Sequence, residues 1–261
     1  MVPQVKDTIV SSTIINNNSL KKALQLAVKN QTDITQTFTE SIIFHHGVKV
    51  KLMKDVHFLI KDFHGLKILQ LRYPMYEKKM RPMKGLHYVA LHNTEKSLPE
   101  IMKDHLRRFP GIGFHYLITK EGVIIQTRSH KFEGDHTKNQ NNGKVAVCFM
   151  LDLDKHKLNK NMISAYNNLL NFIKNHHIIK KEFGHGELTV LKVNWMLRDK
   201  KIPYQVNHKD LFNVKNVKMF ETKLKKELSK LKRLKVPKKI ANELAETTTC
   251  PGVHAYKLFD F

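Results

Sequence analysis

The sequence predicts an α/β protein whose mixed central β-sheet is flanked by helices. Short apolar runs bounded by turn residues alternate with longer segments in which apolar residues recur at helical spacing. Beyond residue 80 these segments follow the order strand, helix, hairpin, strand, helix, which is typical of a mixed sheet covered by helices. The composition agrees, because 41% hydrophobic and 26% charged residues are ordinary values for a folded globular protein.

Residues 1–80 are predicted to form an extension that precedes the main domain. Residues 1–40 are polar and rich in Asn, Thr and Gln, so we expect this part to be only partly ordered. Residues 41–75 hold short apolar runs separated by turn residues such as Gly47 and Gly65, which predict strands joined by turns. The second half of the extension is therefore expected to be β-rich.

The main domain, residues 81–261, is predicted to begin with a strand and a helix. Residues 87–94 form an apolar run that ends in polar residues, and residues 98–109 have helical spacing with Pro99 in the first turn. Residues 114–126 then carry two apolar runs on either side of a Lys-Glu-Gly turn, which predicts a β-hairpin.

The elements that follow are a further core strand, at residues 144–153, and an amphipathic helix, at residues 161–177. Residues 221–235 are strongly basic, with leucines at helical spacing, and we interpret them as a surface helix that packs its leucine stripe. The alternative is a helix dedicated to binding a polyanion. The stripe consists of Leu224, Leu228, Leu231 and Leu234.

The charge balance favours a polyanionic partner, because 46 Lys and Arg against 23 Asp and Glu leave a formal net charge of +23. Charge alone does not choose between nucleic acid and the anionic polymers of bacterial walls, and solvated lysines on helix faces would account for much of the excess. Nucleic-acid binding is the weaker alternative, because the sequence has neither an RNP motif nor a zinc-finger spacing.

The two cysteines, Cys148 and Cys250, are too few for a disulfide framework, and we do not expect them to pair. The N-terminus has no basic stretch followed by an apolar run, and no later segment is apolar for long enough to span a bilayer. The expectation is synthesis in the cytoplasm with no visible Sec signal.

A candidate zinc site stands out by position among the 16 histidines. His92 ends a predicted buried strand, His185 lies between two glycines, and Cys250 precedes Pro-Gly near the end of the sequence. Two imidazoles and one thiolate supply three ligands of tetrahedral zinc and leave the fourth position for water or substrate. Each residue alone also has an ordinary explanation, as a core histidine or a small buried cysteine.

Several segments around these residues follow one another in a recognisable order: LHNT, GFHYLITKEGVIIQ, DHTKNQNNGKVAVCFML, FGHGELT and TTTCPG. In this order they resemble the zinc-dependent N-acetylmuramoyl-L-alanine amidase family, which includes amidase-type phage lysozymes and peptidoglycan-recognition proteins. The resemblance covers roughly residues 85–190 and 247–261. It implies that His92, His185 and Cys250 bind Zn²⁺, and that the chain hydrolyses the amide bond between N-acetylmuramic acid and L-alanine in bacterial peptidoglycan.

The resemblance also suggests catalytic auxiliaries. His136 matches a family histidine near the substrate, and Thr248 matches a position at which the family carries Lys or Thr near the reacting oxygen. Phe114 stands where the family has a catalytic tyrosine, and Cys148 stands where another branch has an acid. Since alternate strand residues share a face, we expect Tyr116 to substitute partly for the missing hydroxyl; the alternative is a core aromatic.

The segment between His185 and Cys250 is longer than in the resembled family, which predicts an insertion at about residues 190–246. Because zinc tolerates little ligand movement, the insertion should leave and return as a self-contained unit. Its basic part, residues 215–239, is a candidate site for anionic wall polymers, and the alternative is a peripheral helix with no direct role.

The resemblance implies a phage-type endolysin or a delivered lytic enzyme that acts on the cell wall, in the periplasm or outside the cell. Two alternatives come from other classes: a peptidoglycan-binding protein without catalysis, and a basic nucleic-acid-binding protein. Loss of the ligand cysteine would be the simplest mark of the first alternative, and Cys250 is present.

Overall fold

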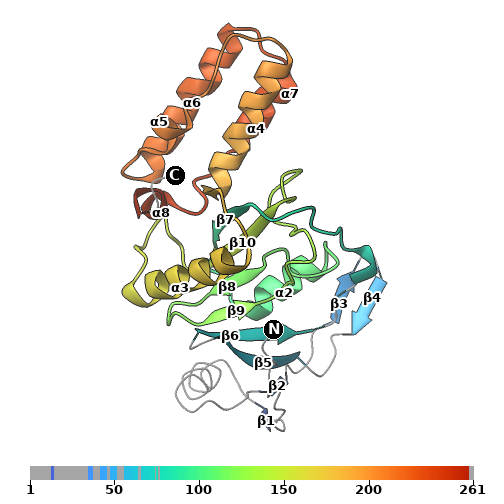
Figure 1. The fold of residues 1–261 in the computed structure, drawn as a ribbon. Helices are drawn as coiled ribbons and strands as arrows, with labels where there is room; N and C mark the ends of the chain where they lie inside the picture. Colours follow the sequence, from blue (N-terminus) through green and yellow to red (C-terminus); the bar gives the residue numbers. More distant parts are fainter. Residues whose placement is uncertain are drawn as a thin grey trace.

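A computed structural model of the chain describes residues 13–14, 35–37, 42–45, 48–51, 56–63, 66–73, 75 and 77–258. Figure 1 shows a twisted sheet with helices on both faces and a group of helices that projects from one end of it. The predicted mixed α/β fold is confirmed. Most of the segment expected to be partly ordered, residues 1–40, lies outside the described residues.

The centre of the sheet combines parallel and antiparallel pairs. Strand β7 lies between β10 and β11 and is parallel to both, and β10 is also parallel to β8. Strands β8 and β9 form the predicted antiparallel hairpin. The bounds are β7 (Tyr88–Asn93), β8 (Tyr116–Ile118), β9 (Ile124–Gln126), β10 (Lys144–Phe149) and β11 (Lys181–Gly184).

Four strands are described within residues 41–75, where the sequence predicted strands, and two of them, β5 and β6, continue the same sheet. Strand β6 pairs in parallel with β9, and β5 pairs antiparallel with β6. Within the described residues the sheet has nine strands in the order β1-β2-β5-β6-β9-β8-β10-β7-β11, and β3 and β4 pair separately. The bounds are β1 (Thr13–Ile14), β2 (Thr35–Thr37), β3 (Ile42–His45), β4 (Val48–Lys51), β5 (Val56–Phe63) and β6 (Leu66–Arg72).

The two faces of the sheet are covered by α2 (Leu98–Leu106) and α3 (Lys160–His176), as the two helical patterns predict. Because strand side chains alternate, Leu91 packs toward α3, whereas Leu117 and Cys148 pack toward α2. Helix α2 begins with a capping box between Ser97 and Glu100. Each face therefore has its own apolar cluster.

Four helices form a projection that we call the helical arm, residues 185–245. It has its own buried cluster, in which Val193, Leu197, Phe220 and Leu244 take part. After the arm the chain returns to the sheet through the segment that carries Cys250. The helices of the arm are α4 (His185–Asp199), α5 (His208–Phe212), α6 (Val217–Arg233) and α7 (Lys238–Ala245), and α8 (Val253–Leu258) follows them.

The basic helix α6 packs its leucines into the arm. This agrees with the interpretation of residues 221–235 as a surface helix that packs its leucine stripe. Leu231 is fully buried, and Leu224 and Leu228 are partly buried against the cluster of the arm. Leu234 instead is 48% exposed, because it caps the helix beyond the last full turn. Three of the four predicted stripe residues therefore contribute to the core.

Two of the absences expected from the sequence hold for the part of the chain that is described. Cys148 and Cys250 are both free thiols. None of the described helices combines the length and the apolar character that crossing a bilayer requires.

The arm core predicts a contrast between two leucines on α6. Leu231→Ala should lower the free energy of unfolding by about 2–5 kcal/mol, because it leaves a cavity in a packed core. The exposed Leu234→Ala should change it by less than about 0.5 kcal/mol. Urea unfolding followed by circular dichroism measures both, and equal losses at the two positions would contradict a packed core in the arm.

Candidate metal centre

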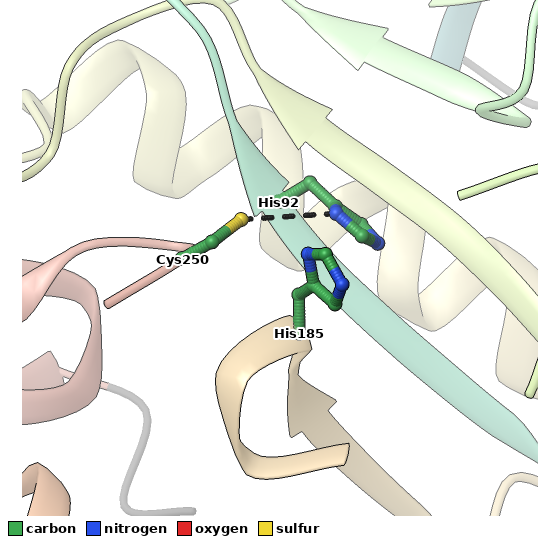
Figure 2. A group of neighbouring side chains, drawn as sticks. All are labelled: His92, His185 and Cys250. Atoms are coloured by element: carbon green, nitrogen blue, oxygen red, sulfur yellow. Dashed lines mark hydrogen bonds between the residues drawn. The ribbon is translucent and has the colours of Figure 1, made fainter. Parts of the chain in front are cut away.

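Three donor side chains converge where strand β7 ends. His92 lies on β7, His185 is the first residue of α4, and Cys250 lies in the loop before α8. Their ligand atoms all lie within 4.8 Å of one another, and Sγ of Cys250 is 3.7 Å from Nδ1 of His92. Figure 2 shows the two imidazoles and the thiol turned toward a common point. The three candidate ligands predicted from the sequence are thus brought together.

Parallel pairing of β7 and β11 brings the two histidines to the same edge. Gly184 ends β11 and lies opposite Leu91 in the register, so His185 follows immediately beyond the sheet, beside His92. The centroids of the two imidazole rings are 4.7 Å apart. Neither the short strand β11 nor the start of α4 at His185 was predicted from the sequence, because the two glycines around His185 obscure the helical pattern.

Two hydrogen bonds to its carbonyl oxygen hold Cys250 in place. The N–H of Gly186 donates to the carbonyl oxygen of Cys250 at 2.8 Å, and the hydroxyl of Tyr256 donates to the same oxygen at 3.0 Å. A side chain at position 186 would not fit, because its Cβ would stand 2.0 Å from the carbonyl oxygen of Thr248. The glycine that follows His185 therefore allows the cysteine loop to approach the histidine.

The donor set fits zinc. In a tetrahedral site, Zn–N bonds of about 2.0–2.1 Å and a Zn–S bond of about 2.3 Å place the nitrogen and the sulfur about 3.6 Å apart. The 3.7 Å between Nδ1 of His92 and Sγ of Cys250 matches this separation. Three donors of this type leave one tetrahedral position for water or substrate.

Burial keeps the three donors neutral when no cation is present. It lowers the pKa of His92 well below its ordinary value, with a further contribution from His185, and lowers the pKa of His185 to about 4. It raises the pKa of the Cys250 thiol to about 12. Both imidazoles therefore present lone pairs at neutral pH, and a dication would favour the thiolate.

His136 lies behind His92. Nδ1 of His136 is 3.0 Å from Nε2 of His92, the nitrogen that does not face Cys250. If His92 held a metal ion through Nδ1, its Nε2–H would donate a hydrogen bond to Nδ1 of His136, which would fix the tautomer and the orientation of the ligand ring. Nε2 of His136 would then be protonated, and it is buried with no partner among the described residues. His136 would therefore orient His92 through Nδ1, while its Nε2–H would make no hydrogen bond within the described residues.

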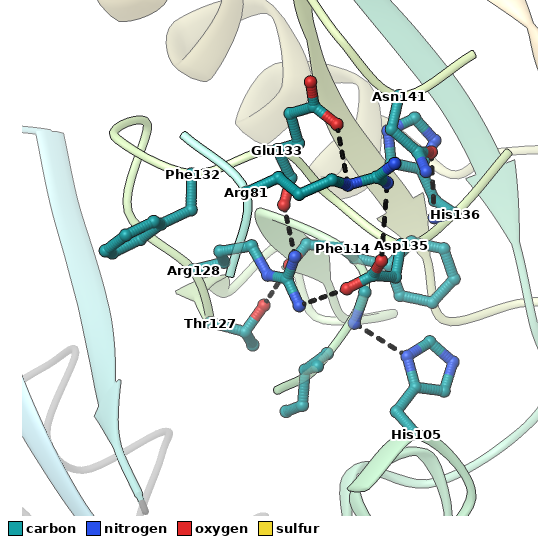
Figure 3. Close-up of polar contacts among 12 residues, drawn as sticks. Arg81, His105, Phe114, Thr127, Arg128, Phe132, Glu133, Asp135, His136 and Asn141 are labelled. Atoms are coloured by element: carbon teal, nitrogen blue, oxygen red, sulfur yellow. Dashed lines mark hydrogen bonds and ion pairs between the residues drawn. The ribbon is translucent and has the colours of Figure 1, made fainter. Parts of the chain in front are cut away.

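The loop that carries His136 is held by a buried arginine (Figure 3). Arg128 is 2% exposed, and its Nη2 donates to Oδ2 of Asp135 at 2.9 Å, while Nη1 donates to the carbonyl oxygen of Glu133. The side chain of Asn141 accepts from the backbone N–H of His136 at 3.2 Å. These bonds fix the backbone on both sides of His136. None of the residues that make them was predicted from the sequence to belong to the site.

Phe114 and Tyr116 do not share a face, so the sequence-based expectation for this pair is wrong. The Phe114 ring packs against His92 at a centroid distance of 5.2 Å, whereas Tyr116 is fully buried in the cluster that faces α3. Strand β8 begins only at Tyr116. Just before it, the side chain of His115 takes the place of a backbone acceptor, because its Nδ1 accepts a hydrogen bond from the N–H of Ala146 at 3.0 Å. The structure does not bring the Tyr116 hydroxyl to the ligand group.

A line of histidines instead runs from Tyr116 toward the surface. The Tyr116 hydroxyl is 2.8 Å from Nε2 of His130, and Nδ1 of His130 is 3.1 Å from Nε2 of His177. Burial, and then the neighbouring His177 and His176, lower the pKa of His130 to about 4. His130 is thus held neutral across the mildly acidic range.

The hydroxyl of Thr248 stays close to the cysteine loop. Thr248 is exposed, and its Oγ1 accepts from the backbone N–H of Cys250 at 3.4 Å. This places the hydroxyl two residues from a candidate ligand, at the open side of the loop. Its predicted role as an oxyanion donor stays a prediction.

A buried carboxylate ties the start of the arm to the sheet. Glu187 is fully buried, and its Oε1 lies 3.1 Å from Nζ of Lys181 on β11 and 3.3 Å from Nε2 of His208 on α5. Its backbone N–H also donates to the hydroxyl of Tyr256 at 3.1 Å. Its position in the segment FGHGELT was the signal available in the sequence, but its ion pair with Lys181 could not be predicted from the sequence.

Comparison with known proteins finds one matching family and several partly similar solved structures. Residues 81–208 match the N-acetylmuramoyl-L-alanine amidase family. No curated protein sequence matches the chain.

Solved structures of similar fold include an endolysin, the N-acetylmuramoyl-L-alanine amidase LysCS from Clostridium intestinale, at 19% identity over 46% of this chain and 80% of that chain, with a TM-score of 0.43. Drosophila PGRP-LB is 23% identical over 45% of this chain and 81% of that chain, with a TM-score of 0.40. PGRP-Hd from Alvinella pompejana is 20% identical over 40% of this chain and 76% of that chain, with a TM-score of 0.37.

The close approach at Gly186 predicts the effect of a single methyl group. Gly186→Ala should displace the carbonyl of Thr248 and with it Cys250, because the added Cβ would lie 2.0 Å from that oxygen. We expect zinc affinity to fall at least tenfold, as it does when residues that support a metal ligand are lost. Competition with a chromogenic chelator measures the affinity, with circular dichroism as the control for folding. Unchanged affinity in a folded variant would contradict the proposed support of Cys250.

The buried His130 predicts acid destabilisation. Because its pKa in the folded state is about 4, the unfolded chain takes up the proton first as the pH falls from about 6.5 to 4, so stability is lost over this window. One such group contributes a slope of at most about 1.4 kcal/mol per pH unit. Chelator-treated His130→Gln should lose less stability than the parent between these pH values, measured by urea unfolding. The control, exposed His156→Gln, should keep the parental slope, and identical slopes in all three proteins would refute the prediction.

Proposed function

Since residues 81–208 belong to the N-acetylmuramoyl-L-alanine amidase family, we propose that this chain is a zinc-dependent hydrolase of bacterial peptidoglycan. Its substrate is the amide bond between the lactyl group of N-acetylmuramic acid and L-alanine. The observation that carries the proposal is the convergence of His92, His185 and Cys250, with a sulfur-to-nitrogen separation of 3.7 Å that suits tetrahedral zinc.

Hydrolysis of an unactivated amide needs an activated water and a polarised carbonyl, and bound zinc supplies both kinds of chemistry. His92, His185 and Cys250 would hold the metal, and His136 would keep His92 in the orientation that coordination requires. The exposed hydroxyl of Thr248 would be a donor for the developing oxyanion, whereas Nε2 of His136 is buried on the side of its ring that does not face His92. The reaction adds water across the C–N bond, leaving a carboxylate on the sugar and an amine on L-alanine.

The proposed setting is the cell wall, reached as a phage-type endolysin or a delivered lytic enzyme. The basic segment, residues 215–239, supports this proposal because it offers cations to anionic wall polymers. Lys225, Lys226 and Lys232 are exposed on α6. Such contacts would weaken as salt rises, since charges farther apart than about 8 Å are largely screened at physiological ionic strength.

A second candidate is a protein that binds peptidoglycan without cutting it. Its support is Phe114, which occupies the position where the sequence resemblance implies a catalytic tyrosine and packs its ring against His92. Tyr116 does not replace the missing hydroxyl, because it lies in the cluster on the other face of the sheet. On this alternative the zinc site would be structural, and the walls would be bound but left intact.

Replacement of the ligand cysteine tests the proposal. The parent should contain one zinc per chain and release peptides with a free L-alanine amino terminus, whereas Cys250→Ser should lose zinc and reduce cleavage at least a hundredfold, because the thiolate supplies a direct bond to the metal. Metal analysis and mass spectrometry of digested muropeptides provide the measurements. The matched control is Cys148→Ala, which removes the other thiol, and it should keep both zinc and activity.

The same experiment separates the two candidates. A parent protein that holds zinc and binds walls but releases no peptide is a binding protein. Full cleavage by Cys250→Ser would rule out the metal assignment itself.

A further inference from the structure

A groove opens on the helical arm, away from the metal centre. Its volume is about 740 Å³, and one wall is a single face of α4 on which Leu191, Asn194, Trp195 and Arg198 recur at helical spacing. The opposite wall is the segment that follows the helix, residues 201–205. None of the three candidate metal ligands lines it, so the groove is separate from the proposed catalytic site.

Hydrogen bonds hold the two walls together. The side-chain amide of Asn194 donates to the carbonyl oxygen of Val206 at 2.9 Å and accepts from the N–H of Val206 at 2.8 Å. The hydroxyl of Tyr204 donates to the carboxylate of Glu227 on α6. The segment is thereby fixed against α4, and a groove formed in advance binds a ligand at a lower entropic cost.

Trp195 is the principal apolar surface of the groove. It is 58% exposed and is the single tryptophan of the chain. The arm does not need Trp195 in its core, because α4 packs there with another face, through Val190, Val193 and Leu197. An indole open to solvent in a concave site offers a flat surface against which the apolar face of a sugar ring can stack.

The charges in the groove select for anions. Arg198 and Lys201 line it, and no Asp or Glu does so among the residues described there. Lys201 has a φ of +54°, a left-handed conformation that favours glycine over other residues. This position thus carries a cation where glycine would fit the backbone better. The guanidinium of Arg198 can bind a carboxylate through two parallel hydrogen bonds.

We propose that this groove binds the glycan strand of peptidoglycan, with a sugar ring on Trp195 and a sugar carboxylate on Arg198 and Lys201. The preference for a carboxylate rests on the proposed function, because water added across the amide leaves a carboxylate on the sugar as the peptide departs with the amine. The groove should therefore prefer glycan from which the peptides have been removed. Such binding would keep the protein on a strand that it has already cleaved.

Intrinsic fluorescence tests the proposal directly, since every tryptophan signal comes from the groove. The full chain with Cys250→Ser is titrated with three probes: peptide-free glycan strands, uncharged chitooligosaccharides of similar length, and inorganic polyphosphate. We expect the peptide-free glycan to shift the emission and to bind about tenfold more tightly than the uncharged oligosaccharide. Polyphosphate should shift the emission much less than the peptide-free glycan does, because it has no sugar ring to stack on Trp195. An emission shift with polyphosphate alone would overturn the proposal in favour of a phosphate polymer.

Two lysine variants form a matched pair. Lys201→Gly and Lys235→Gly each remove one charge from a residue with left-handed backbone, φ +54° and +51°, but Lys235 does not line the groove. Lys201→Gly should weaken binding of the peptide-free glycan about tenfold, and Lys235→Gly should bind it as the parent does. Trp195→Ala should weaken binding of both saccharides at least tenfold, measured by calorimetry. Equal losses in the two lysine variants, or unchanged binding by Trp195→Ala, would refute a groove-specific site.

The outcome is independent of catalysis. Saccharide binding is measured in a variant that lacks the ligand cysteine, so failure of the proposed amidase activity in the parent leaves the binding result intact. Conversely, loss of the groove proposal leaves the cleavage measurement as it stands.

Discussion

The carbonyl oxygen of Cys250 joins the two ends of the helical arm beside the candidate metal ligands. It accepts one hydrogen bond from the N–H of Gly186, beside His185, and another from the hydroxyl of Tyr256. The first helix of the arm starts at His185, and Cys250 follows its last helix. These hydrogen bonds therefore connect the beginning of the helical arm to the segment that follows its end. The chain can therefore leave the sheet for a long helical insertion and still return its thiol to within 3.7 Å of His92. The buried Glu187, which forms an ion pair with Lys181 on β11 and lies close to His208 on α5, reinforces the same junction.

Local patterns in the sequence predicted most of the central fold. Strand β10, the β8–β9 hairpin and the helices α2 and α3 appear close to the predicted ranges, because each has a clear apolar period and recognisable turn residues. The relation between Phe114 and Tyr116 could not be predicted, since it depends on the ring of His115 bonding to the backbone of Ala146, far away in the sequence. Strand β11 and the start of α4 were missed for another reason: the strand is short, and its neighbouring glycines weaken the helical signal.

The candidate site, like the fold, could be predicted from the sequence only in part. The three donors were identified from their types, their positions and the resemblance of the surrounding segments, and the structure brings them together. The place of His136 behind His92 was not foreseen, because a sequence does not tell which imidazole nitrogen faces the metal and which faces a neighbour. The role of Arg128 was equally hidden: a lone arginine in a sequence reads as a surface residue, and only the fold shows that it is buried against Asp135.

The parallel pairing of β6 with β9 also bears on the solubility of the protein. Without β5 and β6, the peptide groups of β9 would form an open sheet edge, and an open edge is a template on which another chain can add a strand. At the other end of the sheet the edge strand β11 is only four residues long and carries Lys181, and both properties discourage such pairing. Strands β5 and β6 thus cover an edge of the sheet that would otherwise be open to pairing with another chain.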